Sequence, residues 1–200
     1  MKKIAYLLEF ILIKILFILF QLIGYRLSSN LGFFIGRTIG PIFRSKKMII
    51  QNLKKANIQD TQNQLKIASN VLGNYGRIFA EYVYLKKFRN NELKRYVSIE
   101  GLEYLENLKK HNKKAVFISG HFNNFELMAM EIEKAGIDLA TIYRPLNNVF
   151  LNKTMEKIRK ENICKNQIKK GRAGSREIIK NVIKGKSIAC LLYTSPSPRD

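Results

Sequence analysis

The chain has 200 residues, of which 46% are hydrophobic and 26% are charged, so it has enough apolar material for one domain with a core. This composition excludes a wholly disordered or fibrous protein. The 36 lysines and arginines against 15 acidic residues give a formal net charge of +21, which indicates anionic partners such as phosphates, anionic lipid headgroups or an acidic protein.

The chain has two cysteines, Cys164 and Cys190, and two histidines, His111 and His121. Two cysteines are too few for a disulfide scaffold and lack the paired spacing of a metal site, which favours a reducing compartment. Protein-built zinc sites usually have three or four histidine or cysteine ligands, so we expect no metal centre.

The first predicted element is an apolar helix over residues 4–23, in which 17 of 20 residues are apolar. A membrane-spanning helix needs about 20 such residues, but Glu9 and Lys14 interrupt the run. Each charge would cost about 2.5 to 3.5 kcal/mol at bilayer depth. Spanning is favoured, while a helix in the membrane interface and a buried soluble helix remain alternatives. The two charges and the lack of a small-residue cleavage pattern argue against a signal peptide.

Glycines recur at every fourth position within the apolar residues 25–43: Gly32, Gly36 and Gly40. This spacing predicts close approach to another helix, although three ordinary glycines in an apolar hairpin would look the same. A basic run follows at Arg44, Lys46 and Lys47, which suits contact with anionic headgroups. We therefore assign residues 1–47 to a membrane anchor with membrane-proximal helices.

Residues 48–200 are assigned to a second domain, which begins with two amphipathic helices over residues 48–88, separated by a break at residues 57–61. The later elements are predicted as strand 114–119, helix 126–135, strand 138–143, helices 149–161 and 175–184, and strand 187–192. This order predicts an α/β fold, a mainly parallel sheet with flanking helices, preceded by the amino-terminal anchor and helical segment.

His121 follows the first predicted strand, and Glu126 lies five positions later at the start of a helix. Sites in open α/β sheets form at the carboxyl ends of strands. There a histidine can act as general base while a carboxylate orients its ring and stabilises the imidazolium. Alternatively, Asn123 and Glu126 form a capping box and His121 is only a turn residue. Spacing alone leaves both roles open.

The segment GHFNNFE at residues 120–126 resembles the His-x-x-x-x-Asp/Glu motif of the lipid A biosynthesis acyltransferases, the late lauroyl and myristoyl transferases, whose usual form is close to GHFGNWE. A second block, YRPLNN at residues 143–148, also resembles that family. The similarity extends over roughly residues 1–190. Asn123 and Phe125 depart from the commonest pattern, but neither would transfer a proton.

The resemblance implies transfer of a fatty acyl chain from acyl carrier protein to a hydroxyl of a lipid A precursor, at the cytoplasmic face of the bacterial inner membrane. No cofactor is implied, because the donor is the carrier thioester. His121 would be the general base and Glu126 would orient it. Four residues are expected to bind substrate: Tyr143, Arg144, Asn147 and Arg159.

Each of these four residues has a simpler alternative role. Arg144 and Arg159 would clamp phosphate or the acidic carrier, or else be solvated surface charges. Tyr143 and Asn147 would position substrate or only shape the loop.

Two other functions fit less well. A glycerolipid acyltransferase shares the His-to-acid spacing but favours Asp and lacks the YRP block. A noncatalytic basic protein bound to anionic lipid or nucleic acid would not need His121. We therefore expect membrane lipids as partners and no nucleic acid.

The carboxyl-terminal sequence CLLYTSPSPRD at residues 190–200 resembles a translated transposase sequencing adapter. Family members continue with an acidic block and more of the domain. We therefore expect a truncated chain with a non-native end, in which Asp200 has no catalytic role. The alternative is a genuine strand end followed by a Ser-Pro loop.

Overall fold

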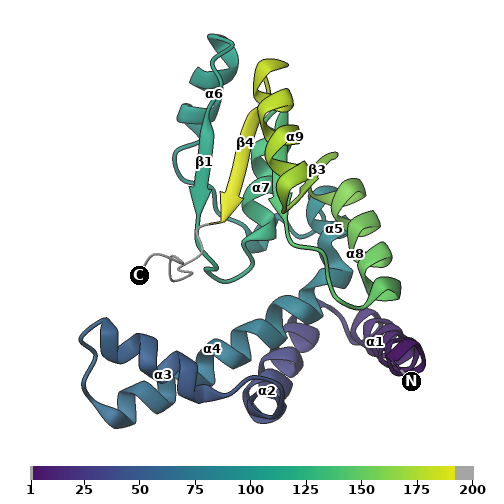
Figure 1. Ribbon diagram of the computed structural model, residues 1–200, viewed down its shortest axis with the longest axis vertical. Helices are drawn as coiled ribbons and strands as arrows, with labels where there is room; N and C mark the ends of the chain where they lie inside the picture. The colour runs from purple at the N-terminus through teal and green to yellow at the C-terminus, as the bar shows by residue number, and fades with distance from the viewer. Residues whose placement is uncertain (1, 192–200) are drawn as a thin grey trace. The chain divides into compact units, whose positions relative to one another are not determined.

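A computed structural model describes residues 2–191 (Figure 1). Of the end predicted to be non-native, residues 192–200 lie outside the described residues. The chain forms two compact units. We call Ile11–Tyr84 the helical unit, and Met1–Phe10 with Leu85–Asp200 the sheet unit. The division into an anchor over residues 1–47 and a domain over 48–200 stays a prediction.

The helical unit contains most of α1 (Lys2–Ile23), together with α2 (Tyr25–Phe43), α3 (Lys46–Lys55), α4 (Thr61–Glu81) and the short 3-10 helix η1 (Tyr82–Tyr84). The two amphipathic helices predicted after residue 48 are confirmed as α3 and α4. Each begins at a side-chain cap: Ser45 accepts a hydrogen bond from the Lys47 amide, and Asp60 accepts one from the Gln62 amide.

Glycines allow α2 and α4 to approach closely. A Cβ added at Gly32 would lie 2.6 Å from both the Ala80 Cβ and the Gly76 carbonyl oxygen. One added at Gly36 would collide with the α4 backbone at Leu72 and Gly76. The close approach predicted from the glycine spacing is therefore confirmed, and α4 is the partner helix.

The sheet unit contains a four-stranded parallel sheet in the order β1-β4-β2-β3. The strands are β1 (Val116–Ser119), β2 (Leu139–Tyr143), β3 (Asn166–Lys169) and β4 (Ser187–Leu191). The helices are α5 (Leu85–Arg89), the 3-10 helix η2 (Lys94–Tyr96), α6 (Leu102–Lys110), α7 (Glu126–Lys134), α8 (Val149–Asn162) and α9 (Arg172–Ile183). The predicted α/β fold with a mainly parallel sheet is confirmed.

The helices cover both faces of the sheet. Ile178 of α9 packs against the core cluster of Ala140, Ile168 and Ile188 on one face. On the other face, Tyr143 is hydrogen-bonded to Glu156 of α8. Because all strands are parallel, the loops after their carboxyl ends lie along one edge of the sheet, which is where sites form in such folds.

The elements β3, α6 and η2 were not predicted. The prediction passed directly from helix 149–161 to helix 175–184, but β3 lies between them, and α9 begins at Arg172. The β3 sequence NQIK has one apolar residue, the buried Ile168, and its strand conformation depends on pairing with β2. Helix α6 was also missed.

Candidate active site

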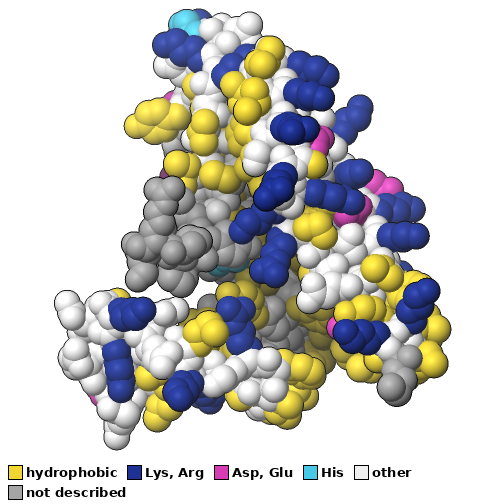
Figure 2. Space-filling view, viewed as in Figure 1, with side chains coloured by type: hydrophobic (Ala, Val, Ile, Leu, Met, Phe, Trp, Pro, Cys, Tyr) yellow, Lys and Arg dark blue, Asp and Glu magenta, His cyan; other side chains and the backbone are white. Residues whose placement is uncertain are grey.

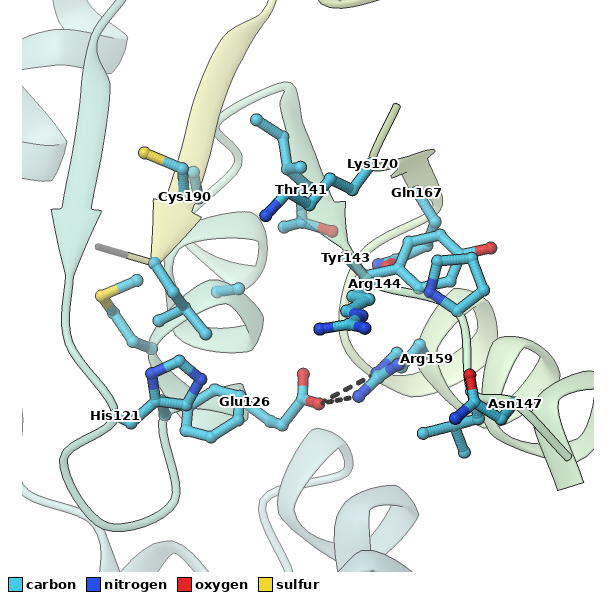
Figure 3. A pocket seen from close by; sticks show the side chains of 18 residues that line it. His121, Glu126, Thr141, Tyr143, Arg144, Asn147, Arg159, Gln167, Lys170 and Cys190 are labelled. Atoms are coloured by element: carbon cyan, nitrogen blue, oxygen red, sulfur yellow. Dashed lines mark hydrogen bonds and ion pairs between the residues drawn. The ribbon is translucent and has the colours of Figure 1, made fainter. Parts of the chain in front are cut away.

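A cavity of about 600 Å³ lies at the carboxyl edge of the sheet (Figure 3). Its lining includes all six residues singled out in the sequence: His121, Glu126, Tyr143, Arg144, Asn147 and Arg159. They come from the end of β2, from the loops after β1 and β2, and from α7 and α8. The parallel sheet brings these segments together, as expected for an open α/β fold.

The loop that carries His121 is shaped by backbone geometry and aromatic packing. Asn123 has a φ of +46°, in the left-handed region that Asn tolerates better than most residues. The His121 ring packs edge to face with Phe125 at a centroid distance of 5.0 Å. Phe125 is also the N-cap of α7 and provides no side-chain cap. The capping-box interpretation of Asn123 and Glu126 is therefore wrong.

Glu126 is held by Arg159 across the cavity. Its Oε1 accepts hydrogen bonds from Nε and Nη2 of Arg159, both at 2.9 Å (Figure 3). Glu126 is buried, with 8% of its surface exposed. Two donors from one guanidinium hold the carboxylate in position, so this pair links α7 to α8. Sequence spacing could not reveal it, because the partners are 33 residues apart.

Arg159 itself rests against Tyr143. The guanidinium carbon lies 5.7 Å from the centre of the Tyr143 ring. The Tyr143 hydroxyl donates to Glu156 Oε1, which also accepts from Asn152 Nδ2 at 2.9 Å and Lys169 Nζ at 3.1 Å. Glu156 and Arg159 are three residues apart on α8 and so share a helix face. That spacing is the signal by which Glu156 could have been found.

This network shifts the pKa values of two groups. Burial, followed by the hydrogen bond to Glu156, raises the pKa of the Tyr143 hydroxyl well above its ordinary value. The hydrogen bond from Tyr143 lowers the pKa of Glu156 to about 2, with further lowering by Asn152 and Lys169. At neutral pH, a neutral Tyr143 therefore faces an ionised Glu156.

The cavity has a basic rim and an apolar wall. Arg144 and Lys170 are exposed at the lining, and sequence analysis did not identify Lys170. Glu126 is the single acidic residue among the described lining residues. The wall includes Met128, Ala129, Pro145, Leu146, Ala189 and Leu191. A substrate with an anionic group and an apolar body suits such a lining.

The two asparagines of the YRPLNN block have different surroundings. Asn147 is exposed and lines the cavity. Asn148 is buried, and its Oδ1 accepts from the amides of Phe150 and Leu151 to cap α8. The sequence pattern indicated Asn147 as a site residue but did not indicate the capping role of Asn148.

Comparison with known proteins identifies the family of the chain. The chain matches the model of the bacterial lipid A biosynthesis acyltransferases over residues 1–193. It belongs to this family. No curated protein matches the chain at a significant level. Membership agrees with the resemblance carried by GHFNNFE and YRPLNN, and it makes this protein an acyltransferase of lipid A biosynthesis.

Proposed function

We propose that this acyltransferase moves a fatty acyl chain of the lauroyl or myristoyl class from the thioester of acyl carrier protein to a hydroxyl of a lipid A precursor. The observation that supports this best is the cavity itself, which gathers His121, Glu126, a basic rim and an apolar wall at one sheet edge.

His121 is the general base. Its imidazole takes the proton of the acceptor hydroxyl while the hydroxyl oxygen attacks the thioester carbonyl carbon. A carbon–oxygen bond forms, the carbon–sulfur bond breaks, and the imidazolium returns the proton to the departing thiolate. No metal or resident cofactor takes part in this sequence.

Glu126 supports the reaction by its charge. A buried carboxylate stabilises the imidazolium that forms at His121, and the two contacts of Arg159 with Glu126 Oε1 keep that carboxylate in place.

The basic rim binds the anionic parts of the substrates. Arg144 and Arg159 bind phosphate of the precursor or of the carrier's prosthetic arm, and the exposed Lys170 adds a third cation. Asn147 donates to substrate from the cavity lining, and Tyr143 positions Arg159. The net charge of +21 attracts the acidic carrier over longer range.

The acceptor is a membrane lipid, so the enzyme works at a membrane surface, and we place it at the cytoplasmic face of the inner membrane. Within the described residues, one helix, α1, is long and apolar enough to cross a bilayer.

The experiment compares His121→Ala with His111→Ala in the intact membrane-bound protein, supplied with acyl carrier protein thioesters and a lipid A precursor. His111 is the matched control, because it is exposed at the end of α6, where its ring contacts Asn107. Loss of a general base lowers the rate about 10²- to 10⁴-fold. The proposal predicts this loss for His121 only.

Wild-type turnover by His121→Ala under single-turnover conditions would contradict the general-base role. Transfer to glycerol 3-phosphate in place of the lipid A precursor would instead indicate the glycerolipid class.

A further inference from the structure

Helix α1 has one exposed apolar face along its whole length. Six side chains on this face are each at least 45% exposed: Ile4, Leu8, Ile11, Ile15, Ile18 and Leu22. Steps of four and three residues place them on one side of the helix. Figure 2 shows hydrophobic side chains gathered over α1.

The other face of α1 is in contact with protein near its amino terminus. The Asn148 side-chain amide donates to the Tyr6 carbonyl oxygen at 2.8 Å and to Glu9 Oε2 at 2.9 Å. Phe10 packs against Phe150, with ring centroids 6.2 Å apart. The charge of Glu9, which interrupts the apolar run, therefore has a polar partner within the sheet unit.

Within the helical unit, the same helix buries Phe17 and Phe20, which are 6% and 2% exposed. Both rings lie against Phe79 of α4, at centroid distances of 5.1 and 6.4 Å. These two phenylalanines are the buried residues of α1, so packing against protein accounts for only a small part of its apolar content. Most of its apolar side chains are exposed.

Length also argues against crossing. Residues 6–10 are docked on the first turn of α8, whose amides are capped by Asn148. A crossing that began at Ile4 would draw these polar groups into hydrocarbon, which is costly. Residues 11–23 alone extend only about 20 Å at 1.5 Å per residue, against a hydrocarbon core of about 30 Å.

We propose that α1 lies flat in the membrane interface and does not cross the bilayer, with its exposed apolar face toward the acyl chains. Helices in this position bury their apolar face about 5 to 10 Å deep. Lys2, Lys3 and Lys14 supply charge for anionic headgroups. Helix α2 has further exposed apolar residues: Leu27, Leu31, Phe34 and Ile42. This inference does not depend on the proposed acyl transfer.

The first test uses tryptophan depth, because the sequence contains no tryptophan. Ile4→Trp, Ile15→Trp and Leu22→Trp are reconstituted singly in vesicles of anionic and zwitterionic lipid, with bromine placed shallow or deep in the acyl chains. A flat helix predicts the same preference for shallow bromine at all three positions. Phe17→Trp is the control on the covered face and should be quenched several-fold less.

A crossing helix gives a different pattern, with deep bromine quenching Ile15→Trp most and shallow bromine quenching the two end positions. That pattern would overturn the proposal, and so would absence of quenching at all three exposed positions.

The second test needs no substitution within the chain. A protease-cleavable tag placed before Met1 should be cut from the same side of the membrane as the exposed loop around Phe122, which is 81% exposed. Cleavage of the tag only from the opposite side would show that α1 crosses, and would overturn the proposal.

Discussion

The two walls of the cavity are built differently. On one wall, His121 sits in a loop shaped by a left-handed Asn123 and an aromatic contact with Phe125. On the other, Arg159 is fixed by Glu126 and rests on Tyr143, whose hydroxyl is bonded to Glu156. The proposed proton transfer takes place at His121 on the first wall. The charged side chains Arg159 and Glu156 lie on the second wall. Removing a group from each wall should therefore have different consequences.

The largest effect on folding is expected from Arg159→Leu, because it leaves the buried Glu126 carboxylate without this guanidinium. Breaking a buried ion pair from one side costs about 3 to 5 kcal/mol of unfolding free energy. The measurement is chemical unfolding in detergent micelles, followed by circular dichroism. Lys157→Leu on the same helix is the control, since its pair with Glu161 is exposed and worth about 1 kcal/mol or less.

The double variant Glu126→Leu with Arg159→Leu sharpens this result. It should recover most of the lost stability but none of the acyl transfer, because replacing both charges by apolar groups is often neutral for folding. If Arg159→Leu were as stable as Lys157→Leu, the pair would have no part in holding α7 to α8.

A smaller effect is expected from Tyr143→Phe, which removes one buried hydroxyl while keeping the ring under Arg159. Leaving Glu156 short of one donor costs about 1 to 3 kcal/mol. Because the ring stays under Arg159, turnover and KM should both change little if Tyr143 acts by positioning Arg159. A rise in KM at unchanged turnover would instead indicate direct binding of substrate by Tyr143.

The pH dependence of stability tests Glu156. Its pKa in the folded protein is about 2, below its ordinary value of 4.5, so its ionised form stabilises the fold above about pH 4.5. This contribution should be lost as the pH falls toward 2. The difference in unfolding midpoint between wild type and Glu156→Gln should therefore shrink from pH 6 to pH 3. Glu161→Gln, with an exposed carboxylate, should show a small difference throughout.

The sequence predicted the elements whose pattern is local. Apolar runs identified β1, β2 and β4, and helical periodicity identified α3 and α4. By contrast, β3 was missed because three of its four residues are polar and pairing with β2 determines its conformation. The site was likewise predictable only where its pattern is local. The motif and its resemblance to the family predicted His121 and Glu126 as site residues. The Arg159 partner of Glu126 depends on how α7 and α8 meet over the sheet.

The smallest expected effects distinguish the two neighbouring asparagines of the YRPLNN block. Asn148→Ala removes the side-chain cap of α8 and should cost about 1 kcal/mol of stability. It also frees Glu9 and the Tyr6 carbonyl from the Asn148 amide, so limited proteolysis near the amino terminus should become faster. Asn147→Ala is the matched control: it removes an exposed residue of the cavity lining, so it should raise KM and leave the unfolding midpoint unchanged. If both variants lost the same amount of stability, capping of α8 would not explain the difference between Asn148 and its neighbour.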